Sequence, residues 1–172
     1  LEADVVVVNH HLLCADLAVK DGNYGSVIPP YDTLVLDEAH LIEDVATQYF
    51  GVQVSSHKID ELVRDVEREL KAASLDAREV RAEAEGLRLR SERFFARLAR
   101  LRLGRLAPGW MTDAAAEESL GLLQRLEGLR TALLAVPDRP EPLAGLAART
   151  LSLTSDVALL MRAEADDHVY FV

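Results

Sequence analysis

The stretch Thr33-Leu34-Val35-Leu36-Asp37-Glu38-Ala39-His40 joins an apolar run to two acidic residues and a histidine. The apolar part predicts a buried strand of a parallel sheet, because such strands are apolar on both faces. Open α/β proteins place ligand-binding groups at the carboxyl ends of these strands. We therefore expect Asp37 to hold a magnesium ion and Glu38 to orient or deprotonate an attacking water. The alternative, compatible with the first, is that Asp37 caps a helix while Glu38 and Glu43 lie in or near its first turn and favour its positive end.

The residues before this stretch predict a βαβ unit. Asp4-Val5-Val6-Val7-Val8 forms a second apolar strand, followed by a helix from His10 to Val19 and a turn-rich loop from Asp21 to Pro30. A βαβ order implies parallel strands with a right-handed crossover. After Asp37 we expect a helix that ends near Phe50, with Gly51 as its C′ residue, and a new helix capped by Ser55 or Ser56.

Residues 56–166 predict about four helices. They are rich in Ala, Leu, Arg and Glu, which favour helix, and contain apolar residues at helical spacing. Residues 169–172 again read as a strand. The fold class is therefore α/β with a large all-α insertion, and is predominantly helical overall. The expected domains are part of a motor domain over 1–55, the helical insertion over 56–166 and a returning strand over 167–172. Helix breaks are expected at 74–76, 106–109 and 137–142.

Composition indicates a soluble globular protein. The chain has 172 residues, of which 49% are hydrophobic and 28% charged. No apolar run approaches the roughly 20 residues that cross a bilayer, and no basic leader precedes the fold, so we expect a cytoplasmic protein without a membrane partner. Cys14 alone forms neither an internal disulfide nor a zinc or iron–sulfur site, and we expect it in a core. The chain starts without methionine and stops within a strand-like run, so we expect an excised segment.

Charge is unevenly distributed along the chain. Residues 1–50 hold nine acidic residues against Lys20, whereas residues 88–105 hold seven arginines against Glu92. Four of these arginines share one helical face and could follow a nucleic-acid backbone: Arg90, Arg93, Arg97 and Arg100. The alternative is a solvated face paired with acidic residues of a neighbouring helix, such as Glu79, Glu83 or Glu85.

Two blocks of sequence carry a family resemblance. Residues 3–13, Ala-Asp-Val-Val-Val-Val-Asn-His-His-Leu-Leu, and residues 34–46, which contain Asp37-Glu38-Ala39-His40, resemble the DinG branch of the DinG/XPD family of superfamily 2 DNA helicases. The closing Val169-Tyr170-Phe171 resembles the strand by which that family re-enters its first RecA-like motor domain. The helical middle resembles its Arch insertion in position and character.

The resemblance implies roles for individual residues. Asp37 and Glu38 match the Walker B acids of the DEAH box, for magnesium and for water activation, and His40 matches the residue that links the nucleotide site to DNA-contacting motifs. Asn9, His10 and His11 match a motif for which we expect packing or hydrogen bonding rather than metal binding. ATP and magnesium are the implied cofactors, and single-stranded DNA the implied partner.

The sequence also departs from the family. It contains no Gly-x-x-x-x-Gly-Lys-Ser/Thr phosphate-binding loop. The family's four-cysteine iron–sulfur module and second motor domain are also absent, so any cluster in the parent has its ligands outside this chain. We expect the chain alone neither to hydrolyse ATP nor to unwind DNA, and the parent to be a 5′ to 3′ helicase of the DNA repair or replication type.

Two other functional classes remain open. The insertion could be a non-catalytic helical module that docks DNA or a protein partner. An exposed apolar patch on residues 112–136 or 141–165 would favour this module. A continuous groove of arginines would favour DNA binding. A small metal-dependent hydrolase would need Asp37, Glu38, His10 and His40 to converge within coordination distance.

Overall fold

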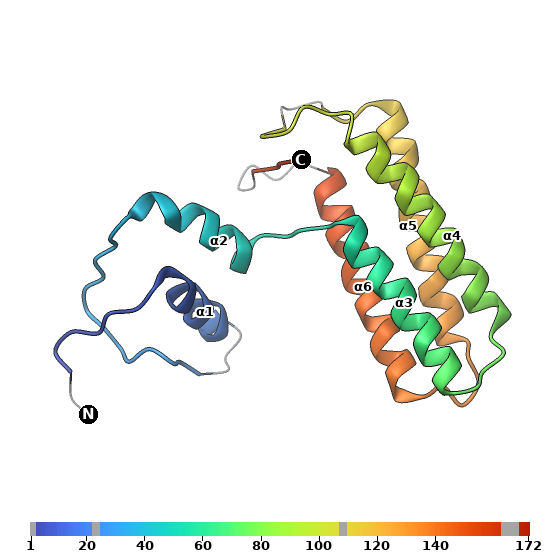
Figure 1. Cartoon of the computed structure of the whole chain (residues 1–172), viewed down its shortest axis with the longest axis horizontal. Coiled ribbons are helices and arrows are strands. Elements are labelled where there is room, and N and C mark those ends of the chain that lie inside the picture. The colour runs from blue at the N-terminus through green and yellow to red at the C-terminus, as the bar shows by residue number, and fades with distance from the viewer. Residues whose placement is uncertain (1–2, 22–24, 107–109, 163–168) are drawn as a thin grey trace. The chain divides into compact units, whose positions relative to one another are not determined.

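Residues 3–21, 25–106, 110–162 and 169–172 are described by a computed structural model of the chain (Figure 1). The chain divides into two units, Leu1–Val52 and Gln53–Val172. In the described residues both units consist mainly of helices, as the prediction of a predominantly helical chain required.

The first unit contains α1 (His10–Asp21), the 3₁₀ helix η1 (Ala39–Leu41) and α2 (Ile42–Phe50). The Asn9 side chain caps α1, because its Oδ1 accepts a hydrogen bond from the Leu12 amide at 2.8 Å. The buried apolar residues of this small unit are Leu13, Cys14, Ile28 and Val45. Cys14 is therefore a core residue, as predicted.

The predicted parallel strands are not seen in the described residues of this unit. Residues 4–8 and 34–36 have no strand assignment, and Val7 and Val35 are 90% and 86% exposed. A strand is stabilised by backbone hydrogen bonds to a neighbouring strand, and these segments have none in the described chain. The expected βαβ unit is thus not confirmed, although its helix, predicted from His10, is.

A buried carboxylate fixes the loop that follows α1. Asp16 Oδ1 accepts hydrogen bonds from the Val27 amide at 2.5 Å, the Ile28 amide at 2.9 Å and the Ser26 hydroxyl at 3.2 Å. Asp16 Oδ2 lies 2.6 Å from Lys20 Nζ. The Lys20 ammonium and the loop amides together hold the pKa of Asp16 far below its usual range. The negative charge of Asp16 therefore attaches residues 26–28 to α1.

The second unit is a bundle of α3 (Ser56–Ala72), α4 (Arg78–Leu98), α5 (Asp113–Leu134) and α6 (Glu141–Arg162). Figure 1 shows the four helices side by side with alternating directions. Helices α3 and α5 each pack against both α4 and α6, which closes the bundle. The predicted four helices and breaks at 74–76 and 137–142 are confirmed; of the break at 106–109, residues 107–109 lie outside the described residues.

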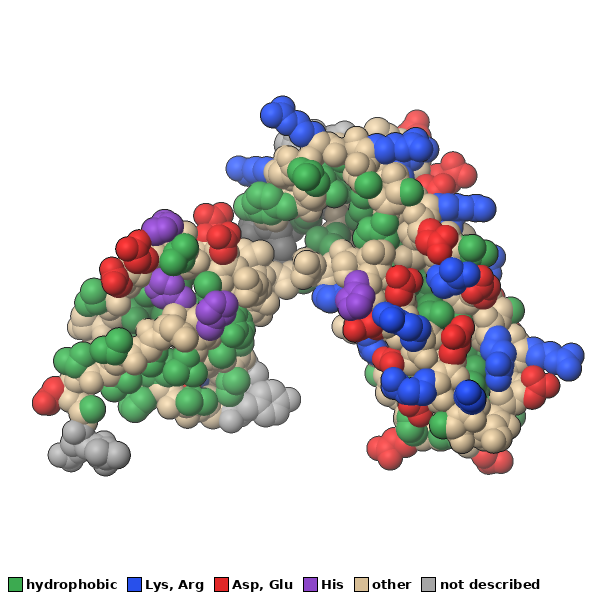
Figure 2. Space-filling model, viewed as in Figure 1, with side chains coloured by type: hydrophobic (Ala, Val, Ile, Leu, Met, Phe, Trp, Pro, Cys, Tyr) green, Lys and Arg blue, Asp and Glu red, His purple; other side chains and the backbone are tan. Residues whose placement is uncertain are grey.

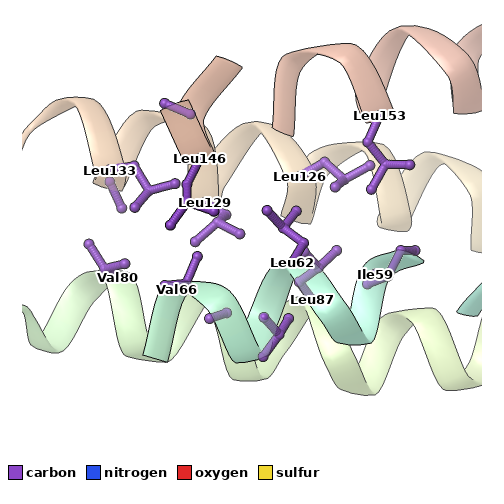
Figure 3. Packing of buried hydrophobic residues seen from close by; sticks show 14 of the residues in the cluster. Ile59, Leu62, Val66, Val80, Leu87, Leu126, Leu129, Leu133, Leu146 and Leu153 are labelled. Atoms are coloured by element: carbon purple, nitrogen blue, oxygen red, sulfur yellow. The ribbon is translucent and has the colours of Figure 1, made fainter. Parts of the chain in front are cut away.

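Leucine, isoleucine and valine fill the centre of the bundle (Figure 3). Each helix contributes side chains at helical spacing that are almost fully removed from solvent. Burying each large side chain contributes about 1.5–3 kcal/mol, so packing rather than helix propensity stabilises the bundle. Residues of this core include Ile59, Leu62, Val66, Val80, Leu87, Leu126, Leu129, Leu133, Leu146 and Leu153.

Local residues set the helix ends. Ser55 caps α3 by accepting a hydrogen bond from the Lys58 amide at 3.3 Å, as predicted. Helix α2 ends before Gly51, also as predicted, but Gly51 has a φ of −79° and does not adopt the left-handed conformation expected of a C′ glycine. A Cβ at position 51 would instead clash with the Thr47 carbonyl oxygen, so close approach of the backbone requires this glycine.

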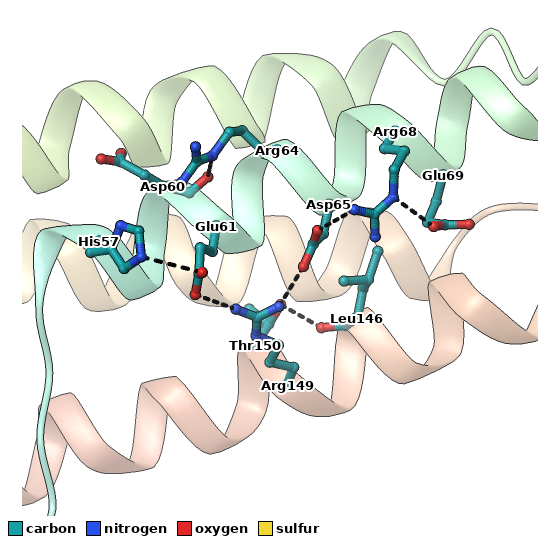
Figure 4. A network of polar contacts seen from close by, with 10 residues as sticks. All are labelled: His57, Asp60, Glu61, Arg64, Asp65, Arg68, Glu69, Leu146, Arg149 and Thr150. Carbon is teal, nitrogen blue, oxygen red and sulfur yellow. Dashed lines mark hydrogen bonds and ion pairs between the residues drawn. The ribbon is translucent and has the colours of Figure 1, made fainter.

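Polar contacts join α3 to α6 along one side of the bundle (Figure 4). Arg149 of α6 lies 2.6 Å from Asp65 Oδ2 and 3.6 Å from Glu61 Oε2. Both acidic residues also contact basic residues of α3, namely Arg68 and His57. Because these side chains share partners, ordering one of them reduces the entropy cost of ordering the next.

The last described residues pair with the segment after α4. Gly104 and Val172 exchange backbone hydrogen bonds of 2.9 and 3.1 Å, and the Leu106 amide donates to the Tyr170 carbonyl at 2.8 Å. Arg105 and Phe171 thus form an antiparallel bridge within the second unit. The predicted returning strand is thus seen only as this isolated bridge over residues 169–172, and its residues 167 and 168 lie outside the described residues.

Among the described helices, α6 is long and apolar enough to cross a bilayer, with a mean hydropathy of 1.3 over its most apolar window. No apolar segment of this kind was expected from the sequence. A helix packed in a soluble core passes the same test, and α6 packs through Leu143, Ala147 and Leu153 in the core of the bundle. One such helix is weak evidence for a membrane span.

Candidate functional site

Asp37 and Glu38 form a turn that leads into η1. Glu38 has φ 49° and ψ 46°, which is the left-handed region, and this conformation costs a non-glycine residue about 1–2 kcal/mol. Its amide donates to Asp37 Oδ1 at 3.0 Å, and its carbonyl accepts from the Leu41 amide at 2.9 Å. Backbone strain of this kind is found at functional sites, so the turn is a candidate site.

The Asp37 carboxylate is exposed and does not cap a helix. It accepts a hydrogen bond from the adjacent Glu38 amide, and neither η1 nor α2 has a side-chain cap. Glu43 and Asp44 lie in the first turn of α2 instead, where they favour the positive end of the helix. The second oxygen of Asp37 is therefore available for a ligand.

Glu38 and His40 lie together on this turn. His40 Nδ1 is 3.3 Å from Glu38 Oε2, and the two side chains are 70% and 66% exposed. A carboxylate beside an imidazole can orient a water or exchange a proton. Of the three residues that the sequence singled out here, the structure brings Glu38 and His40 into contact and places Asp37 beside them in the chain.

The proposed ligand set of a metal-dependent hydrolase does not converge. No group of three or more His, Cys, Asp or Glu side chains in the described residues could hold a metal. His10 lies at the start of α1, and the ring of His11 meets that of Tyr49 with centroids 6.1 Å apart. Asn9 and His11 thus cap and pack α1, as we expected. One exposed carboxylate, Asp37, fits a magnesium ion that is held mainly by phosphates and water.

The four arginines of the predicted basic face differ in their surroundings. Arg90 is half-buried, lies 3.2 Å from Glu118 Oε2 and donates to the Glu117 carbonyl at 3.2 Å. In the part of the chain that the structure describes, the side chains of Arg93, Arg97 and Arg100 have no hydrogen bond or ion pair. Three cationic groups are thus free to bind an anion, whereas Arg90 joins α4 to α5. Arg100 lies past the end of α4 at Leu98, so the predicted face of four arginines on one helix is shorter than expected.

The three acidic residues expected on a neighbouring helix, Glu79, Glu83 and Glu85, lie on α4 itself, and two of them pair with other arginines. Glu85 lies 2.5 Å from Arg88 on the same helix, and this contact lowers the pKa of Glu85 and raises that of Arg88. Glu83 lies 3.2 Å from Arg125 of α5. Glu83 and Glu85 therefore do not neutralise the predicted basic face.

A groove runs between α4 and α5 beside this face. It has a volume of about 400 Å³ and is lined from α4 by Gly86, Leu89, Arg90 and Arg93, and from α5 by Gly121, Gln124 and Arg125. The contribution of α5 to the groove was not predicted from the sequence. Glycine inside a helix lowers helix stability by about 1 kcal/mol relative to alanine. The glycines within α4 and α5 could therefore have indicated that these helices approach closely.

The surface charge of the two units differs. In Figure 2 the polar side chains visible on the first unit are mainly acidic residues and histidines, whereas arginines and lysines are spread over the second unit among acidic residues. This pattern agrees with the acidic character of residues 1–50.

Two curated proteins are similar to part of this chain. The ATP-dependent DNA helicase YoaA of Escherichia coli (strain K12) is 48% identical over 66 residues, and the protein of the same name from Haemophilus influenzae is 47% identical over 66 residues. The match covers 38% of this chain and only 10% of each relative. No protein-family model matches the chain, and no solved structure matches it. Over these 66 residues the chain is thus similar to two proteins named as DNA helicases, and the match spans about a tenth of their length.

Proposed function

We propose that the chain is a segment of an ATP-dependent DNA helicase of the DinG branch, which moves 5′ to 3′ in DNA repair or replication. Residues 1–55 belong to its first RecA-like motor domain, 56–166 to an Arch insertion, and 167–172 return to the motor domain. The similarity to two helicases named YoaA carries this proposal. The match covers about a tenth of each relative, and in this proposal the parent is a longer, cytoplasmic protein.

In this proposal the Asp37-Glu38 turn handles the nucleotide. Asp37 would hold the magnesium ion of MgATP, which neutralises charge on the phosphates during transfer. Glu38 positions and deprotonates the attacking water, and the αL conformation supports this role by fixing its backbone. His40, in contact with Glu38 at 3.3 Å, couples the nucleotide site to the segments that contact DNA.

The helical unit contacts single-stranded DNA in this proposal. The candidates are Arg90, Arg93, Arg97 and Arg100, of which the last three have no partner in the described residues. The alternative of a protein-docking module gains less support: the large apolar residues exposed on α5 and α6 are scattered, namely Leu120, Leu134 and Leu151, and single exposed apolar residues are normal on protein surfaces.

The isolated chain is not expected to hydrolyse ATP. Its sequence has no glycine-rich loop with lysine to hold the phosphates, and any iron–sulfur cluster of the parent has its ligands elsewhere. In the complete helicase, the other parts of the protein supply these groups.

An unwinding assay with the complete protein tests this proposal. Duplexes with a 5′ or a 3′ single-stranded tail are incubated with MgATP, and strand separation is followed by fluorescence. We expect unwinding of the 5′-tailed substrate and its loss in the Asp37→Ala variant, with Asp44→Ala as the control, because Asp44 is also exposed and follows the turn. Unwinding by Asp37→Ala at the rate of the control would contradict the role of Asp37.

A further inference from the structure

We infer that the groove between α4 and α5 binds the phosphates of a single-stranded DNA backbone, with Arg93 and Arg125 as the main donors. This inference rests on the proposed function and adds a site on α5 to it. The groove differs from the predicted basic face, which belonged to α4 alone. The strand would thus lie along the seam between two helices.

Two glycines create the groove. A Cβ at position 86 would lie 3.1 Å from Arg125 Nη1, and a Cβ at position 121 would clash with the Arg90 guanidinium. Glycine at both positions therefore lets arginine side chains lie across the facing helix. The remaining space, about 400 Å³, exceeds what one phosphate group needs.

The lining of the groove is basic. It includes three arginines and no acidic residue. The two carboxylates that contact these arginines, Glu83 and Glu118, each bind one of them at 3.2 Å. Arg93 has no such partner in the described residues, so the groove keeps an excess of positive charge, and Gln124 adds an uncharged amide donor.

The three arginines have different roles. Arg90 has its Nη1 near Glu118 and its Nη2 on the Glu117 carbonyl, so it is a positioning residue that forms the wall of the groove. Arg125 uses Nη1 for Glu83, and its other donors have no partner among the described residues. A guanidinium that keeps a face free can bind a phosphate with two parallel hydrogen bonds.

The basic face of α4 continues the groove. Arg97 follows Arg93 one turn later on α4, about 6 Å farther along the axis, and Arg100 lies in the turn just past the end of α4. A strand seated between Arg93 and Arg125 could therefore continue along the free cationic groups of Arg97 and Arg100. This continuity favours a linear polyanion over an isolated anion.

Equilibrium binding of the 172-residue chain to fluorescein-labelled oligo(dT) tests the inference. Anisotropy is measured across a salt series for the wild type, Arg93→Gln and Gln124→Glu, the last of which places a carboxylate in the groove. We expect each variant to bind about tenfold more weakly, as for loss of a hydrogen bond between charged groups. For Arg93→Gln the slope of log K against log salt should fall by about 0.7, the value for one phosphate of a single strand.

Matched controls separate the groove from overall charge. Arg78→Gln removes the same charge at the other end of α4, and Gln48→Glu makes the same change on exposed α2; both should bind like the wild type. An abasic strand of equal length should compete as well as oligo(dT), because the groove contacts phosphates. Circular dichroism establishes that each variant is folded.

Two results overturn the inference in distinguishable ways. In the first, the folded groove variants bind DNA like their controls, while Arg97→Gln and Arg100→Gln bind it more weakly. The DNA then follows these arginines and not the groove, and the proposed function stands. If the folded wild type binds no oligo(dT) at low salt, the groove inference and the DNA-contact role of the helical unit both fail.

Discussion

The guanidinium of Arg90 lies where a side chain at position 121 would have to be placed. Gly121 is buried on α5 and Arg90 is half-buried on α4, so the two positions depend on each other. Arg90 then reaches Glu118 and the Glu117 carbonyl. Close packing of α4 on α5, and the shape of the groove beside them, follow from this pair.

Replacing glycines in the bundle should separate packing from helix propensity. Gly145→Ala on α6 meets no atom within 4 Å and should raise the free energy of unfolding by about 0.5–1 kcal/mol, because alanine restricts the unfolded chain. Gly121→Ala should not show this gain, because Arg90 must move and its ion pair is lost. Urea unfolding measures both variants, and an equal gain for both would mean that Arg90 does not occupy the space at Gly121.

The core of the bundle should respond to truncation according to burial. Leu126 is fully buried on α5, whereas Leu120 of the same helix is 57% exposed. Leu126→Ala should lower the free energy of unfolding by about 2–5 kcal/mol through lost burial and a cavity. Leu120→Ala should change it by no more than about 0.5 kcal/mol. If thermal or urea unfolding shows comparable losses of stability for Leu126→Ala and Leu120→Ala, α5 is rotated differently in the bundle.

The contact between Asp16 and residues 26–28 should depend on pH. The folded pKa of Asp16 is held below its unfolded value, so its contribution to stability is complete above about pH 4 and is lost as pH falls toward the folded pKa. The amide resonances of Val27 and Ile28 should therefore keep their positions through pH 4 and move only at lower pH.

The variant Asp16→Asn is the control for this titration. In Asp16→Asn the low-pH movement of the Val27 and Ile28 amides should disappear. If these amides already move above about pH 4 in the wild type, Asp16 does not hold the loop through its charge.

The Arg149 contacts between α3 and α6 should contribute modestly and depend on salt. Arg149 lies 2.6 Å from Asp65 Oδ2, and the side chains are 41% and 24% exposed. A double-mutant cycle with Asp65→Asn and Arg149→Met should give a coupling energy of about 0.5–1 kcal/mol that falls at high salt. A coupling near zero at low salt would mean that solvent screens the pair completely.

The helices were predictable from the sequence because local signals specify them. Ser55 caps α3, apolar residues recur at helical spacing through α3 to α6, and Pro137 and Pro140 separate α5 from α6, with Pro142 in the first turn of α6. The sheet was not predictable in the same way. The apolar segments around Val7 and Val35 satisfy strand periodicity, but pairing depends on a neighbouring strand that the described residues do not supply.

The candidate sites were predictable to different degrees. The candidate site at Asp37 and Glu38 was singled out from four consecutive residues, and its chemistry stays a prediction. The groove combines Arg93 with Arg125, which lie on different helices. Periodicity shows which residues of one helix share a face, but it does not show which face of α5 packs against α4. Arg125 could therefore not be assigned to the site from the sequence.

ATP hydrolysis by the complete protein, stimulated by single-stranded DNA, reports directly on the proposed role of the Asp37-Glu38 turn. Glu38→Gln removes the proposed base and keeps the shape of the side chain, while Glu43→Gln makes the same change at an exposed position in α2. We expect Glu38→Gln to hydrolyse ATP about 100-fold or more slowly and still to bind DNA, with Glu43→Gln active. If Glu38→Gln hydrolyses ATP at the rate of Glu43→Gln, Glu38 is not the base and the proposed helicase site is wrong.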